Sequence, residues 1–194
     1  ACLTCHVDNA TSTGSTQFGT FLAFDVESFE LPHQIGWRNF EQREAFRRLN
    51  ALVLETQPAK GVGDFIRGVY GGTEQNPGVN VINTQPDWNW MPDTWAATDP
   101  GTYEYVYKPY CRGCHMAVES GSAYFDGPDG PDTFGSSLQF LVCGQPSTQA
   151  DAEAKANDPV RSMPQAEVPF RRFWAGGAPS YVSGTYGFDC VPNE

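Results

Sequence analysis

The sequence predicts a mainly α protein with long irregular loops and few short strands. An apolar helical period runs through residues 37–57, and residues 72–101 are rich in Gly, Pro, Asn, Asp and Trp without any period. Two short cysteine motifs lie at residues 2–6 and 111–115. A chain of 194 residues can bury one core or two small cores that share an interface. We therefore expect one compact unit, with region 1–100 around the first motif and region 101–194 around the second.

The first half is expected to hold two helices. Residues 21–26 predict a short strand or extended segment. Residues 37–57 predict the longest helix, which Pro58 ends. Its expected buried face consists of Phe40, Phe46, Leu49, Leu52 and Val53. Residues 64–70 predict a second short helix, broken by Gly71 and Gly72.

The second half is expected to alternate helices with turns. Residues 103–119 predict a helix that carries the second motif and is kinked by Pro109. Residues 121–135 are turn-rich, residues 151–157 predict a short polar helix, and residues 169–175 begin a final helix. Residues 181–190 are expected to be extended.

Both motifs have the sequence C-x-x-C-H, which is the attachment signature of c-type haem. Two thiols on one helical turn can each add to one vinyl group of the porphyrin, and the next imidazole is then aimed at the iron. The predicted residues are Cys2, Cys5 and His6 for haem one, and Cys111, Cys114 and His115 for haem two. We therefore expect two covalently bound haem c groups and a cytochrome c-like fold whose loops wrap them.

Other uses of these cysteines fit less well. A zinc site could use both C-x-x-C pairs, but structural zinc sites rarely place His directly after each second Cys. A thioredoxin-like pair usually belongs to a βαβ chain, and no such alternation is visible. A disulfide cannot easily join two cysteines on one helical turn.

The sixth iron position needs a second ligand, and His or Met there is typical of an electron-transfer site. The chain has three histidines and three methionines. Met116 adjoins His115 and cannot reach the opposite face of the ring. Met163 is the predicted distal ligand of haem two, because Pro164 forces an extended or turn backbone that can present its sulfur. For haem one His33 is favoured, and Met91 or a group from another chain stays open.

Charge and cysteine use indicate the surroundings of the protein. A net charge of -11 argues against nucleic-acid binding, and no apolar run is long enough to predict a membrane span. Cys143 and Cys190 could form a disulfide in an oxidising compartment, or could be two buried thiols. With no leader before the first motif, we expect a mature secreted chain in the periplasm or outside the cell.

The chain resembles the c-type cytochrome superfamily in its C-R-G-C-H motif after a tyrosine-rich helix and in the segment MPQAEVPFRRFW. It is similar in particular to poorly characterised bacterial cytochrome c family proteins, in which FLAFDVESFE, AFRRLNALVLETQP and a Met-Pro segment ending in Phe-Trp recur in this order. The resemblance implies that His115 is the proximal ligand and Met163 the distal ligand of haem two. It implies no distal ligand for haem one.

The leading hypothesis is a di-haem cytochrome that carries single electrons between redox proteins and is not an enzyme. A di-haem peroxidase would need one open iron and, as the family resemblance implies, is usually a longer chain. A subunit of an extracellular conducting filament is the other alternative, because a haem near residue 2 could stack on a haem of the next subunit. Such a head-to-tail contact propagates into a fibre when it does not close.

Overall fold

The computed structural model describes residues 21–29, 31–73, 78–79, 86–118, 125, 129–141 and 167–187. The elements are η1 (Val26–Ser28), α2 (Asn39–Glu55), α3 (Lys60–Val69), α4 (Asp93–Thr98), α5 (Pro100–Thr102), η2 (Tyr103–Tyr107), α6 (Lys108–Tyr110), α7 (Arg112–His115), α8 (Gly130–Leu141), α10 (Glu167–Ala175) and α11 (Ala178–Tyr186). The mainly α class is confirmed. The few short strands do not appear in the described ranges, where residues 21–25 belong to no helix or strand.

Helix α2 confirms the helix predicted at residues 37–57, but its predicted apolar face is wrong. Phe46 and Val53 are buried as expected, whereas Phe40, Leu49 and Leu52 are exposed. The buried face is completed by two polar residues, Arg47 and Asn50.

The burial of these polar residues has a local cause. The Asn50 amide accepts a hydrogen bond from the Phe24 backbone N–H at 2.8 Å and donates one to the Phe24 carbonyl at 3.0 Å. The Arg47 guanidinium donates to the Val79 carbonyl and to Glu44. Each buried polar group therefore satisfies backbone that would otherwise lack a partner, which keeps its burial from being costly.

Helix α3 supplies much of the first hydrophobic core. Val62, Phe65, Ile66 and Val69 are buried at the three- and four-residue spacing of a helix face. This confirms the second short helix, which begins earlier than residue 64.

The segment before the second motif is a π-helix, η2, that continues into α6. The Lys108 N–H donates to the Tyr103 carbonyl, five residues earlier. Pro109, in the next position, has no N–H and would crowd the carbonyl four residues before it in a regular α-helix. The wider π turn accommodates this proline. The break comes two residues later, at Cys111, whose φ is -122°.

Two predictions for the second half are wrong. Residues 130–135 belong to helix α8, where Phe134 and Leu138 are buried one helical turn apart. Residues 181–186, expected to be extended, belong to α11. Helix α11 has Pro179 in its first turn and ends at Gly187, which adopts the left-handed φ of 68° that favours glycine. Helix α10 confirms the helix at residues 169–175, although α11 follows it.

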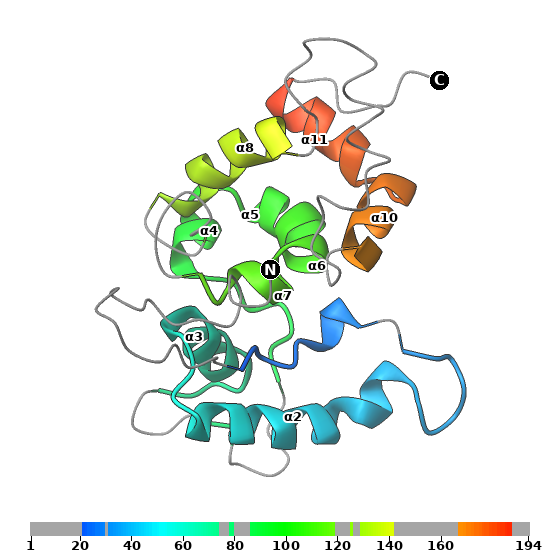
Figure 1. The fold of residues 1–194 in the computed structure, drawn as a ribbon, viewed down its shortest axis with the longest axis vertical. Coiled ribbons are helices and arrows are strands. Elements are labelled where there is room, and N and C mark those ends of the chain that lie inside the picture. The colour runs from blue at the N-terminus through cyan, green and yellow to red at the C-terminus, as the bar shows by residue number, and fades with distance from the viewer. Residues whose placement is uncertain are drawn as a thin grey trace, which may run out of the picture.

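The described residues form two hydrophobic cores. The first core joins α2, α3 and the buried pair Met116 and Ala117, and the second joins α4, η2, α8, α10 and α11. Figure 1 shows α2 and α3 at one end of the molecule and α8 and α11 toward the other, with α4 to α7 between them and α10 beside α6. Both cores draw residues from both sides of residue 100, and the division into regions 1–100 and 101–194 stays a prediction.

None of the helices in the described part of the chain is both long and apolar enough to cross a bilayer.

Candidate functional site: the second C-x-x-C-H turn

Residues 111–115, which we call the motif turn, lie between the two cores. Cys111 is the N-cap of α7, and the N–H groups of Cys114 and His115 both donate to the Cys111 carbonyl, at 3.2 and 3.1 Å. These bonds close one helical turn, so residues three and four apart lie on the same side of it. Cys111 and Cys114 are reduced thiols, and both residues are half-buried.

Two close contacts hold the motif turn against its neighbours. A Cβ added at Gly113 would lie 2.9 Å from Ser28 Oγ, so a larger residue at this position would require the Ser28 hydroxyl to turn away. On the other flank the His115 imidazole packs against the Phe125 ring, with ring centroids 4.6 Å apart and planes tilted by 35°. His115 is half-buried, whereas Phe125 is buried.

The pKa of Cys111 bears on the thioredoxin-like alternative for this motif. Burial, with a smaller contribution from Cys114, raises the pKa of the Cys111 thiol to about 12. A thioredoxin-like pair needs a nucleophilic thiolate, which requires a lowered pKa. The environment of Cys111 is therefore unsuited to dithiol exchange at neutral pH.

Arg112 occupies the second position of the motif and is almost completely buried. Its side chain is 2% exposed and forms an ion pair with Asp25, which is 1% exposed. Arg112 Nε donates to Asp25 Oδ2 at 2.8 Å, and Nη2 lies 2.7 Å from the same oxygen. Nη1 donates to the Tyr103 hydroxyl at 3.1 Å, and the guanidinium carbon lies 4.7 Å from the centroid of the Phe65 ring.

The charge of Arg112 is retained despite this burial. Burial alone would lower the pKa of the guanidinium, but the Asp25 charge and the Tyr103 hydroxyl together raise it above its ordinary value. The guanidinium is therefore charged at neutral pH, and its ion pair with Asp25 ties the motif turn to a segment 87 residues earlier in the chain.

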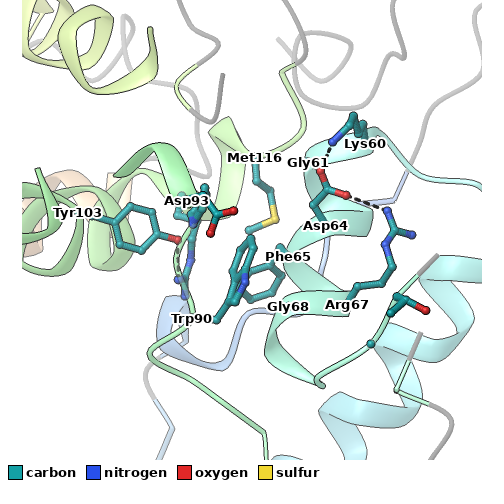
Figure 2. Close-up of a pocket in the computed structure, with 14 residues that line it drawn as sticks. Lys60, Gly61, Asp64, Phe65, Arg67, Gly68, Trp90, Asp93, Tyr103 and Met116 are labelled. Atoms are coloured by element: carbon teal, nitrogen blue, oxygen red, sulfur yellow. Dashed lines mark hydrogen bonds and ion pairs between the residues drawn. The ribbon is translucent and has the colours of Figure 1, made fainter. Parts of the chain in front are cut away.

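A cavity of about 410 Å³ lies on the side of the motif turn where Arg112 and Met116 are found. Figure 2 shows Phe65 and Trp90 beside the Met116 thioether, and Asp64 bonded to both Lys60 and Arg67. Neither cysteine of the motif turn lines this cavity, and nor does His115. The motif turn thus has one side that faces the cavity and another that carries the thiols and the imidazole.

The two candidate ligands for haem one that the structure describes lie in different environments. His33 is exposed in the loop between η1 and α2, where its carbonyl accepts a hydrogen bond from Arg38 Nε at 3.2 Å. Met91 is half-buried and packs against the second core, as Cys111 does. The remaining predicted residues lie outside the described ranges: Cys2, Cys5, His6, Cys143, Met163 and Cys190.

A metal site of His, Cys, Asp and Glu side chains is a separate question from haem attachment. Within the described ranges, no three such side chains gather into a group that could hold a metal ion. A zinc site built from both C-x-x-C pairs would need Cys2 and Cys5, which are not described.

Sequence reasoning missed Arg112 and Asp25. Asp25 stands in the apolar stretch FLAFDV, where a carboxylate flanked by hydrophobic residues is a signal of a buried partner. The identity of that partner could not be read from the chain, because no local pattern connects residues so far apart.

The reduced thiols, the following imidazole and the half-buried side that carries them fit the attachment of haem c, because two sulfurs on one turn and an adjacent nitrogen are the groups that such attachment needs. Comparisons of the chain with family models, with curated proteins and with solved structures found no match.

Proposed function

We propose that the protein is a di-haem c-type cytochrome that carries single electrons between redox partners outside the cytoplasm. The observation that carries this proposal is the motif turn, in which two reduced thiols share one helical turn and His115 follows at once. The first motif at residues 2–6 repeats the same residue types at the same spacing.

Different residues of this chain would attach the porphyrin of haem two, bind its iron and hold the iron ligand in place. Cys111 and Cys114 would hold the porphyrin through thioethers, and His115 would bind the iron from one side. Haem bound in this way supplies a one-electron couple between ferric and ferrous iron. Phe125 would keep the imidazole in place by packing against its ring. Met163 is the proposed distal ligand.

The charge of the chain indicates what kind of partner would dock. A net charge of -11 favours association with a surface that carries Lys and Arg, because opposite potentials steer the encounter. We therefore expect electron exchange with a basic redox protein to slow as salt is added.

Covalent attachment is the direct test. The protein would be produced with haem maturation in the periplasm, and its intact mass and pyridine haemochrome spectrum would be measured. We expect two haems per chain, with one lost in Cys111→Ser/Cys114→Ser and the other lost in Cys2→Ser/Cys5→Ser. A mass equal to the bare polypeptide, or complete loss of colour into acid acetone, would refute the proposal.

The distal ligand has its own test. Met ligation of ferric haem gives a near-infrared band, which Met163→Leu is expected to abolish while both haems stay attached. Met116→Leu serves as the matched control that keeps the band, because Met116 adjoins His115 and cannot reach the opposite face of the ring. An unchanged spectrum in Met163→Leu would remove Met163 from the site without affecting the attachment of the haems.

Spectra and microscopy of the same material would separate this function from its two rivals. Five-coordinate high-spin haem with turnover of peroxide would favour a peroxidase. Fibres in electron micrographs would favour a filament subunit, whereas separate particles are expected of a carrier.

A further inference from the structure

The ion pair between Arg112 and Asp25 needs an explanation beyond stability. Both side chains are almost completely removed from water, at 2% and 1% exposure. Removing two charges from water costs several kcal/mol per ion, and well-packed apolar residues of similar volume often replace a buried pair without loss of stability. A buried pair at the centre of a functional motif is therefore a candidate for a role in that function.

The pair fixes the motif turn in three directions. Asp25 holds the guanidinium from the segment that precedes η1, Tyr103 holds it from η2, and Phe65 packs on it from α3. These contacts come from three separate segments of the chain and meet at one side chain of the motif turn. The rest of the turn, with its thiols and imidazole, is oriented as a consequence.

The pair also places two opposite charges in a buried environment, and one of them belongs to a residue three positions from His115. Arg112 and His115 are three residues apart on one helical turn, so their Cβ atoms lie roughly 5–6 Å apart. In a water-excluded site, charges interact far more strongly than they do across water. Removal of either charge would leave the other one uncompensated and buried in the part of the protein that would hold the haem.

We propose that Arg112 is a positioning residue for haem two and that its ion pair with Asp25 sets the reduction potential of this haem; the inference rests on the proposed function. One electron converts ferric to ferrous haem and lowers the charge of the iron centre by one. A nearby positive charge therefore favours the ferrous form and raises the potential, and a nearby negative charge lowers it.

The sign of the shift distinguishes this role from a merely structural one. Asp25→Asn leaves the Arg112 charge uncompensated, so the potential of one couple is expected to rise. Arg112→Gln leaves the Asp25 charge uncompensated, so the reduction potential of the same haem is expected to fall. The double variant Asp25→Asn/Arg112→Gln removes both charges. Its reduction potential should therefore return toward that of the unchanged protein.

A conservative variant separates charge from geometry. Arg112→Lys keeps the positive charge but loses the planar fork that bonds Asp25 and Tyr103 together. We expect its potential to stay near that of the unchanged protein, while its urea midpoint falls.

The experiment is a redox titration of the di-haem protein followed by its visible spectrum, with electrons supplied by an electrode. Haem content is first measured by pyridine haemochrome in every variant. Arg48→Gln and Glu55→Gln are the charge-matched controls, because both residues are exposed on α2. We expect neither control to shift the reduction potential of either haem as much as Asp25→Asn or Arg112→Gln does.

Each outcome decides the inference. Opposite shifts in Asp25→Asn and Arg112→Gln, with recovery in the double variant, would support it. Full haem content with unchanged potentials would overturn it and leave the proposed function standing. If the reduction potentials of Asp25→Asn and Arg112→Gln shift in the same direction, or if the variants are only less stable, the inference is overturned and the ion pair has a structural role only. If Arg112→Gln does not accumulate, Asp25→Asn decides alone, and the inference is overturned if its reduction potential does not rise. If no haem is covalently bound at Cys111 and Cys114, both this inference and the proposed function are overturned.

Discussion

Gly68 is the position where the Trp90 indole comes closest to helix α3, and we expect Gly68→Ala to destabilise the protein. A Cβ added there would lie 2.1–2.4 Å from three atoms of the indole, whereas ordinary van der Waals contact begins at 3.4 Å. The indole would have to move by roughly 1 Å, and it packs edge to face on Phe65 with centroids 6.0 Å apart. The substitution therefore disturbs one wall of the cavity.

Two opposing contributions set the magnitude. Replacing a glycine by alanine within a helix stabilises a protein by about 0.5–1 kcal/mol. Forcing extra volume into a packed site costs about 1–3 kcal/mol. We expect the steric cost to exceed the helix gain, with a net loss of about 1–2 kcal/mol in the free energy of unfolding.

Urea denaturation followed by far-ultraviolet circular dichroism would measure this loss. Gly184→Ala is the matched control, because Gly184 lies in α11 and an added Cβ meets nothing within 4 Å. Gly184→Ala should raise the midpoint, and Gly68→Ala should lower it. In a Trp90→Ala background, Gly68→Ala should no longer be destabilising. A midpoint that rises in Gly68→Ala as much as in Gly184→Ala would refute the steric argument.

Two further predictions concern the second core. Trp95→Phe replaces the buried indole with a smaller aromatic ring and removes the 2.8 Å hydrogen bond from Trp95 Nε1 to the Phe125 carbonyl. Because that buried carbonyl loses its donor, we expect the free energy of unfolding to fall by at least about 1–3 kcal/mol; an unchanged urea midpoint would contradict this. Burial is the main cause that raises the pKa of Tyr186 to about 12 from an ordinary value of 10.0. Because the fold favours the neutral phenol, its contribution to stability is complete below pH 10 and is lost as the pH rises toward 12. Urea midpoints measured on both sides of pH 10 should therefore fall less steeply in Tyr186→Phe than in the unchanged protein, and equal slopes would count against the assignment.

Local patterns predicted helices best where apolar spacing and end signals agree. Helix α2 was predicted nearly to its ends, because Pro58 and the period of Phe46 and Val53 indicate the same element. Its buried face was not predictable in the same way. Asn50 is buried because it bonds the backbone of Phe24, 26 residues away, and no hydrophobicity pattern contains that contact.

Helix α11 was missed although its end signals are present in the sequence. Tyr181 and Val182 are typical strand residues, although Pro179 lies in the first turn of the helix and Gly187 follows its end. Here packing decided the outcome, because Val182 is completely buried on the helix face that meets the second core. Tertiary contacts therefore overrode the local preference.

The helical turn of the candidate site was predicted, and its surroundings were missed. The spacing of Cys111, Cys114 and His115 requires only one helical turn, which five consecutive residues can form by themselves. The Arg112 and Asp25 pair requires two distant segments to meet, and this follows only from the packing of the whole fold.

The chain changes sides as it passes through the motif turn. Cys111 packs on the second core, and five residues later Met116 is buried in the first. A chromophore tied to such a crossing point would sense the melting of either half. The visible absorbance recorded during heating would then tell whether the halves come apart together or in sequence, without any added label.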